Sequence, residues 1–209
     1  MTVNYALDDG YGAGARLGLI VLSTDETLEN EARQVLAGRP VSLLHSRIPA
    51  QAEVTPDALG TMEGHIESTA ALLPEGLSAV GFGCTSGATV IGPERVAALI
   101  GAKQGDAAVT NPMSAVLAAL GALGARRIAL LTPYVDSVNE PLVAALKAGG
   151  VEVVKRASFE ESNDWSVARI READTLAAMK QLGAGGIAMP FLPVAPTCGV
   201  FPFWKKRRR

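Results

Sequence analysis

The stretch Leu77-Ser-Ala-Val-Gly-Phe82-Gly-Cys84-Thr-Ser-Gly87 contains the pattern that decides the fold of this 209-residue chain. Residues 77–82 form a short, mostly apolar run of the length of a buried β-strand, and the glycines that follow permit a tight turn. Residues 93–102 then show a helical pattern with a proline in the first turn. A buried strand, a tight turn and a helix in this order are typical of a parallel sheet covered by helices.

The same alternation of apolar runs and helical patterns extends outward to both ends of the chain. Further strands are predicted at residues 16–22, 41–46, 107–110, 127–131, 151–156 and 186–192. Helices are predicted to start within residues 25–31 and to cover residues 55–73, 111–123, 135–148 and 166–182. Two successive halves of similar size indicate an α/β protein of two flavodoxin-like lobes with parallel sheets, residues 1–110 and residues 111–209. Open sheets of this kind bind ligands at the carboxyl ends of their strands.

Composition excludes several classes of protein. The chain is 48% hydrophobic and 19% charged with a formal net charge of −2, which argues against disorder and against a nucleic-acid surface. Its longest apolar runs are too short to span a bilayer, and its first residues lack the apolar core of a secretory signal. Two cysteines without an export signal indicate reduced thiols. We therefore expect a cytoplasmic protein with no nucleic-acid or membrane partner, in which residues 205–209 (Lys-Lys-Arg-Arg-Arg) are an isolated basic end.

Cys84 is the residue with the clearest chemical potential. It stands between the end of a predicted strand and the start of a helix, where unpaired backbone N–H groups and the positive helix end favour thiolate over thiol. The sequence therefore predicts a depressed thiol pKa. The hydroxyls of Thr85 and Ser86 beside it suit a carboxylate or an enolate oxygen. A small buried cysteine in a strand-to-helix turn remains the alternative.

Motifs for a metal or a nucleotide cofactor are not apparent. The glycine-rich residues 10–14 precede the first predicted strand, whereas a dinucleotide-binding loop follows it. His45 and His65 lack the spacing of metal ligands. We therefore expect no cofactor and no metal.

Three strings resemble a known enzyme group. Residues 83–92 (Gly-Cys-Thr-Ser-Gly-Ala-Thr-Val-Ile-Gly), 17–21 and 131–134 (Leu-Thr-Pro-Tyr) resemble the maleate isomerase and arylmalonate decarboxylase branch of the aspartate/glutamate racemase superfamily. Residues 19–27 are most similar to the ectoine-utilisation members of that branch. The resemblance covers residues 16–192. It implies two pseudo-symmetric lobes, no cofactor, and an active site in the cleft between the lobes, with one cysteine from each lobe on opposite faces of the substrate.

The resemblance also implies roles for individual residues. The first cysteine of the family falls on Cys84, and its oxyanion-stabilising tyrosine falls on Tyr134. Thr132, in the same motif, and Asn163 are further candidate contacts to substrate. A packed aromatic side chain is the alternative role for Tyr134.

Asp25 departs from the family pattern. Related isomerases hold a substrate carboxylate with an asparagine at the matching position. An anionic side chain repels a second carboxylate, so an acid that carries an amine or an amide fits this site better than a symmetric dicarboxylate. Alternatively, Asp25 only caps the following helix.

The second cysteine of the family occurs in a motif Ser-Cys-Thr-Asn-Leu-Arg after the last predicted strand. Cys198 is the candidate here, but it comes a few residues late and its neighbours differ. Synonymous codons for residues 194–199, read one base out of frame, can spell Cys-Thr-Asn-Leu-Arg. We therefore expect a truncated or frame-shifted C-terminal segment, irregular after about Pro193, with Cys198 not opposite Cys84. A divergent tail in which Cys198 serves as the second catalytic thiol is the alternative.

These expectations lead to a cofactor-independent isomerase or racemase that acts on a small carboxylate or an amino-acid-like substrate through the Cys84 thiolate. Thr85, Ser86 and Tyr134 would donate to the developing enolate. A malonate-type decarboxylase is one alternative, although arylmalonate decarboxylases have their cysteine in the second lobe. A non-catalytic protein that binds small carboxylates is the other. A homo-oligomer is also expected.

Overall fold

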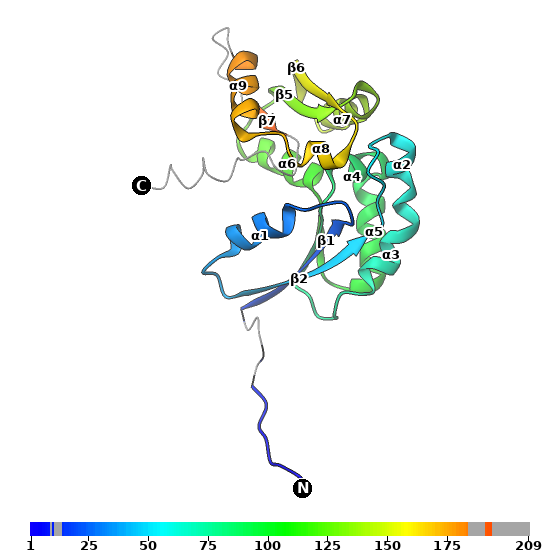
Figure 1. Cartoon of the computed structure of the whole chain (residues 1–209), viewed down its shortest axis with the longest axis vertical. Coiled ribbons are helices and arrows are strands. Elements are labelled where there is room, and N and C mark those ends of the chain that lie inside the picture. The colour runs from blue at the N-terminus through cyan, green and yellow to red at the C-terminus, as the bar shows by residue number, and fades with distance from the viewer. Residues whose placement is uncertain (9, 11–13, 184–190, 194–209) are drawn as a thin grey trace.

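The computed structural model describes residues 1–8, 10, 14–183 and 191–193 and consists of two α/β lobes (Figure 1). The sheet of the first lobe has four parallel strands in the order β2-β1-β3-β4, and the sheet of the second has three in the order β6-β5-β7. The strands are β1 (Ala15–Leu22), β2 (Val41–Ile48), β3 (Ala79–Phe82), β4 (Ala108–Thr110), β5 (Arg127–Tyr134), β6 (Glu152–Glu161) and β7 (Phe191–Pro193). The parallel α/β architecture predicted from the apolar runs is confirmed.

Both lobes share one topology. In each sheet the first strand along the chain, β1 or β5, lies between the second and the third. Ile20 of β1 pairs with Phe82 of β3, and Ala129 of β5 pairs with Phe191 of β7. Nearly all of β5 is buried, because a central parallel strand is covered by helices on both faces.

The helices follow the predicted pattern with local differences. The predicted helix 55–73 is interrupted at Met62, and the predicted helix 166–182 divides into two. Thr55 accepts a hydrogen bond from the Ala58 N–H at 3.3 Å, which confirms it as an N-cap. The helices are α1 (Leu28–Leu36), α2 (Pro56–Thr61), α3 (Glu63–Ala70), α4 (Thr85–Ile91), α5 (Pro93–Gln104), α6 (Pro112–Ala122), α7 (Asp136–Ala148), α8 (Asp164–Val167) and α9 (Glu172–Gly183).

The two lobes are joined by a shared core and by a short backbone strip. One cluster of buried apolar residues contains side chains of both lobes, among them Ile20 and Leu130. At the strip, the Val54 N–H donates to the Ser162 carbonyl at 2.7 Å, and the Asp164 N–H donates to the Ala52 carbonyl at 2.8 Å. These bonds hold the start of α8 against the first lobe (Figure 1).

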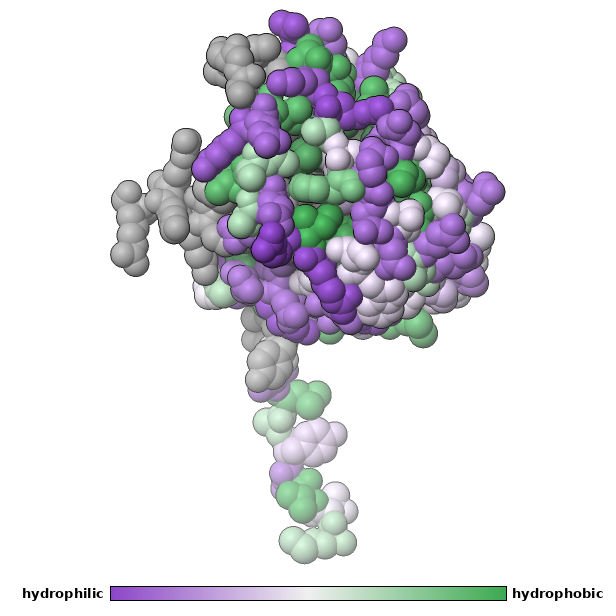
Figure 2. Space-filling model, turned by 45° about the horizontal axis from the view of Figure 1, so that its top comes forward, coloured by the Kyte–Doolittle hydropathy of each residue, from purple (hydrophilic) through white to green (hydrophobic). Residues whose placement is uncertain are grey.

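Residues 1–8 extend away from both lobes and are exposed (Figure 1). The face of the molecule in Figure 2 carries mostly hydrophilic side chains, with small hydrophobic patches between them. Within the described ranges, the helices are too short or too polar to cross a membrane.

Candidate active site

A cavity of about 380 Å³ lies at the carboxyl ends of β1, β3, β4 and β5. This is the edge at which parallel sheets bind ligands. Its lining comes from both lobes. The polar and reactive side chains among the lining residues are Glu31, Gln51, Glu53, Cys84, Thr85, Ser86, Thr110, Asn111, Tyr134 and Asp164. The cavity therefore brings together Cys84, Thr85, Ser86 and Tyr134, four of the residues predicted from sequence.

Cys84 caps α4, and its side chain is buried. Its Sγ atom accepts a hydrogen bond from the Gly87 N–H at 3.2 Å and lies 3.7 Å from the Ser86 hydroxyl. Position 87 has no room for a side chain. A Cβ atom on Gly87 would lie 3.0 Å from Sγ of Cys84 and 2.4 Å from Cε of Met62. The short turn between β3 and α4 thus holds the thiol at a defined point of the cavity wall.

The predicted depressed pKa of Cys84 is wrong for this ligand-free structure. Burial raises the pKa of the thiol to about 11. The hydrogen bonds from Gly87 and Ser86 oppose this effect, while the negative charges of Asp164 and Asp25 add to it. The backbone donor that the sequence predicted is present, but desolvation outweighs it. Cys84 is therefore a neutral thiol near neutral pH.

Tyr134 ends β5 and is buried with its side chain at the cavity. Its carbonyl oxygen accepts hydrogen bonds from the Asn139 amide at 2.6 Å and from the Ser158 hydroxyl. Thr132 donates to the other end of the Asn139 amide at 2.6 Å. Thr132 is not among the lining residues, and its predicted contact with substrate stays a prediction; in the structure its hydroxyl binds the amide that holds the Tyr134 carbonyl.

Sequence reasoning did not find Asn139, which is fully buried on α7. Its neighbours on the buried side of the helix are Val138, Leu142 and Leu146. The one sequence feature that could have indicated Asn139 is a single asparagine on an otherwise apolar helix face. A buried amide there needs hydrogen-bond partners from neighbouring elements.

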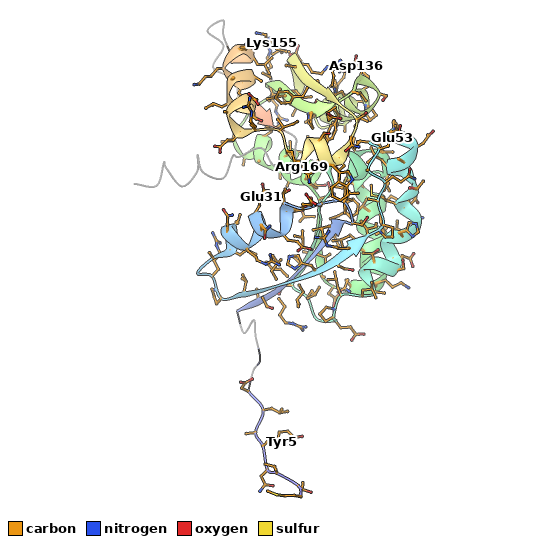
Figure 3. The ribbon with its side chains drawn as sticks, viewed as in Figure 1. Tyr5, Glu31, Glu53, Asp136, Lys155 and Arg169 are labelled. Carbon is orange, nitrogen blue, oxygen red and sulfur yellow. The ribbon has the colours of Figure 1, made fainter. Side chains whose placement is uncertain are left out.

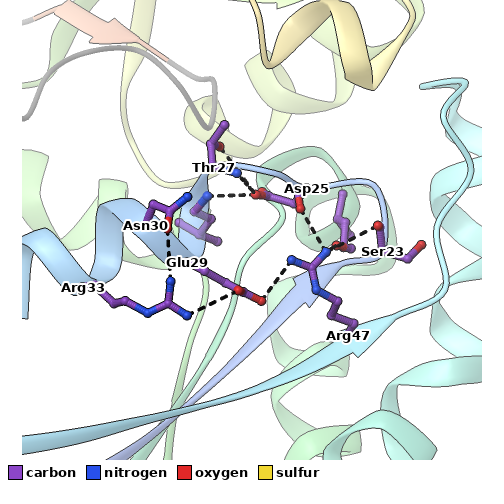
Figure 4. A network of polar contacts seen from close by, with 9 residues as sticks. Ser23, Asp25, Thr27, Glu29, Asn30, Arg33 and Arg47 are labelled. Atoms are coloured by element: carbon purple, nitrogen blue, oxygen red, sulfur yellow. Dashed lines mark hydrogen bonds and ion pairs between the residues drawn. The ribbon is translucent and has the colours of Figure 1, made fainter.

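Asp25 does not line the cavity either, and its predicted contact with substrate stays a prediction. Its carboxylate accepts hydrogen bonds from the N–H groups of Thr27 at 2.7 Å and Leu28 at 2.8 Å, just before α1 (Figure 4). Arg47 donates to the Asp25 carbonyl at 2.9 Å and forms an ion pair with Glu29 at 3.1 Å. The alternative role, a cap of the following helix, describes Asp25 here, and this cap explains why α1 begins at Leu28.

Asn163 is exposed, and its side chain caps α8 by accepting from the N–H groups of Trp165 at 3.0 Å and Ser166 at 3.4 Å. It is absent from the cavity lining, and its predicted contact with substrate stays a prediction. The next residue, Asp164, enters the cavity instead. Its Oδ2 atom accepts a hydrogen bond from the Thr24 hydroxyl of the first lobe at 2.5 Å. Sequence reasoning missed Asp164 by one position, because the cap turns the Asn163 side chain back to its own helix.

Cys198 and the tail predicted after Pro193 lie outside the described residues. Of the predicted strand 186–192, the described part is β7, which pairs with β5 through Phe191 and Leu192.

Comparison with known proteins places the chain in a family. Residues 17–188 match the family described as arylmalonate decarboxylase. A maleate isomerase of Nocardia farcinica is 26% identical over 201 residues, which cover 87% of this chain and 80% of that protein.

Two solved structures share the fold. A maleate isomerase variant of Pseudomonas putida with maleate has a TM-score of 0.77 and 21% identity, and the match covers 93% of this chain and 85% of that chain. A Nocardia farcinica maleate cis-trans isomerase mutant with a covalently bound succinylcysteine intermediate has a TM-score of 0.73 and 23% identity, with 93% and 92% covered. The chain therefore belongs to the arylmalonate decarboxylase family, in the maleate isomerase and arylmalonate decarboxylase branch of the aspartate/glutamate racemase superfamily.

Proposed function

We propose that this protein is a cofactor-independent isomerase that converts a small cis-unsaturated carboxylate to its trans isomer through a covalent bond to Cys84. The observation that carries the proposal is that Cys84 and Tyr134, from different lobes, line one cavity. The related Nocardia farcinica isomerase with a succinylcysteine intermediate supports covalent chemistry at a cysteine in this fold.

The chemistry proceeds in three steps. The Cys84 thiol gives up its proton to a base as its sulfur bonds to one alkene carbon. The π electrons move toward the substrate carboxylate, which becomes enolate-like until the other carbon takes a proton, so that sulfur and hydrogen have added across the double bond. The former double bond is now single and rotates. Loss of that proton from carbon and departure of the thiolate then restore the alkene as the trans isomer.

Hydrogen-bond donors stabilise the charge that develops on the carboxylate. Tyr134 is positioned for this from the second lobe, and Thr85 and Ser86 are positioned from the turn that holds the thiol. The acid that protonates carbon belongs on the face opposite Cys84. Cys198 would supply it only under the alternative of a divergent tail, whereas the frame-shifted segment expected from sequence leaves that acid unassigned.

The test combines turnover with detection of the adduct. The purified protein is incubated with maleate and with other small cis-enoates, and cis-to-trans conversion is followed by chromatography. Mass spectrometry of the acid-quenched protein should show an adduct of one substrate mass on Cys84. Cys84→Ser, which keeps the size of the side chain, should abolish both signals without changing the circular dichroism spectrum. An active Cys84→Ser protein, or an adduct on another residue only, contradicts the mechanism.

Racemisation of an amino acid is the alternative reaction. It requires two proton-transferring groups, one on each face of the substrate α-carbon. Solvent deuterium incorporated at the α-carbon of an amino acid by the wild-type protein would favour racemisation. Conversion of a cis-enoate without that exchange would favour isomerisation.

A further inference from the structure

The cavity is acidic. Its lining residues, within the part of the chain that the structure describes, include three carboxylates, Glu31, Glu53 and Asp164, and no lysine, arginine or histidine. Glu31 belongs to α1 and Glu53 to the segment that precedes α2, so these acids reach the cavity from different elements (Figure 3). None of the three forms an ion pair with another described residue.

The arginines close to this region are engaged elsewhere. Arg47 binds Glu29 and backbone carbonyls of the loop after β1. Arg169 forms an ion pair with Glu26 at 2.9 Å and donates to the Trp165 carbonyl. Glu26 and Glu29 therefore have counter-charges, whereas the three cavity acids form no ion pair with any residue that the structure describes.

Asp164 is the cavity acid that acts on the nucleophile. It is half-buried, the Thr24 hydroxyl orients its carboxylate, and its charge raises the pKa of the Cys84 thiol. Burial and the charge of Asp25 in turn raise the pKa of Asp164. Burial is the largest cause of both shifts, and the neighbouring negative charges add to it.

A symmetric dicarboxylate is poorly suited to this arrangement. With one carboxylate directed to Tyr134 and the donors near Cys84, its second carboxylate would meet the charge of Asp164 and be repelled. A cationic amine at that end would instead form a charge-assisted hydrogen bond with Asp164. We propose that Asp164 determines specificity, and that the substrate is a small cis-enoate with a cationic amine in the place where maleate has its second carboxylate. This inference rests on the isomerase function proposed above.

Binding of such a substrate would also prepare the thiol for reaction. An ammonium group beside Asp164 supplies the missing positive charge and favours the thiolate of Cys84.

The experiment compares two substrates and two unreactive analogues. The substrates are maleate and cis-γ-aminocrotonate, which carries an aminomethyl group in place of one carboxylate. The analogues are succinate and γ-aminobutyrate, whose binding is measured by titration calorimetry. The wild-type protein should favour the amine in both pairs by at least about tenfold, a difference of roughly 1.4 kcal/mol. Asp164→Asn should abolish or reverse that preference.

Asp106→Asn is the matched control, because Asp106 is exposed and outside the cavity, and it should keep the wild-type preference. Asp164→Glu retains a carboxylate and should keep the preference for the amine, which separates charge from folding effects.

The outcomes separate this inference from the proposed function. Turnover of maleate with no preference for the amine, unchanged in Asp164→Asn, overturns the role of Asp164 and leaves the isomerase intact. If neither compound reacts at Cys84, the proposed function fails, and the affinities for succinate and γ-aminobutyrate still decide whether Asp164 selects an amine. Equal affinities in the wild-type protein would contradict that selection.

Discussion

At the scale of single residues, the neutral thiol of Cys84 has a measurable consequence. Because its pKa is raised to about 11, the thiolate fraction is small at neutral pH and increases with pH. Alkylation of Cys84 in the ligand-free protein should accelerate about tenfold per pH unit from pH 7 toward that pKa, as thiolate reactivity requires. Asp164→Asn removes a nearby negative charge and should lower the pKa, giving faster labelling at each pH. Peptide mapping after timed alkylation measures this, with Asp106→Asn as control. Rapid labelling that does not change with pH near neutrality would contradict the raised pKa.

Tyr134 allows a second test at this scale. If its hydroxyl donates to the developing enolate, Tyr134→Phe should lower kcat about 10²-fold, as removal of one oxyanion donor does, and change KM much less. Tyr5→Phe, in the exposed N-terminal segment, is the matched control and should have no effect. An unchanged kcat in Tyr134→Phe would reduce Tyr134 to a packing role.

At the scale of elements, the start of α8 separates two roles of Asn163. As a helix cap it is replaceable by aspartate, which caps equally well, whereas alanine should cost about 1 kcal/mol of unfolding free energy. Asn163→Asp should therefore keep stability and activity near the wild-type values. Asn163→Ala should lower stability and raise KM, because it loosens the segment that carries Asp164. Denaturant unfolding and steady-state kinetics of both variants measure this. Strong loss of activity in Asn163→Asp with normal stability would instead support the contact with substrate expected from sequence.

At the scale of the whole molecule, the shared core and the backbone strip at residues 52–54 and 162–164 predict a single unfolding transition. Cys84 reports on the first lobe through pulsed alkylation and peptide mapping, and Trp165 reports on the second through fluorescence in a Trp204→Phe background, which leaves a single tryptophan. Both probes should give the same urea midpoint, and two separate midpoints would show that the lobes unfold independently. The homo-oligomer expected from sequence remains a proposal, and a midpoint that rises with protein concentration would support it.

Local chemistry by itself determined the elements of this protein and the place of its nucleophile. The apolar runs predicted parallel strands, since strand and helix periodicities are properties of short segments. Ligands were expected at the carboxyl ends of the parallel strands. Cys84, just after β3, and Tyr134, the last residue of β5, do line one cavity at these strand ends. Met62, where the predicted helix 55–73 is interrupted, shows where local pattern was insufficient.

Only the tertiary structure decided what surrounds the thiol. Asp164 reaches Thr24 across 140 positions of sequence, and no local pattern indicates which residue of its loop turns inward. Asp25 and Asn163 were expected at the substrate but turn back to cap their own helices. The pKa of Cys84 moved opposite to the prediction, because a hydrogen bond from a neighbouring turn is a local effect, whereas desolvation and the charges of Asp164 and Asp25 arise only when the chain folds around the sulfur.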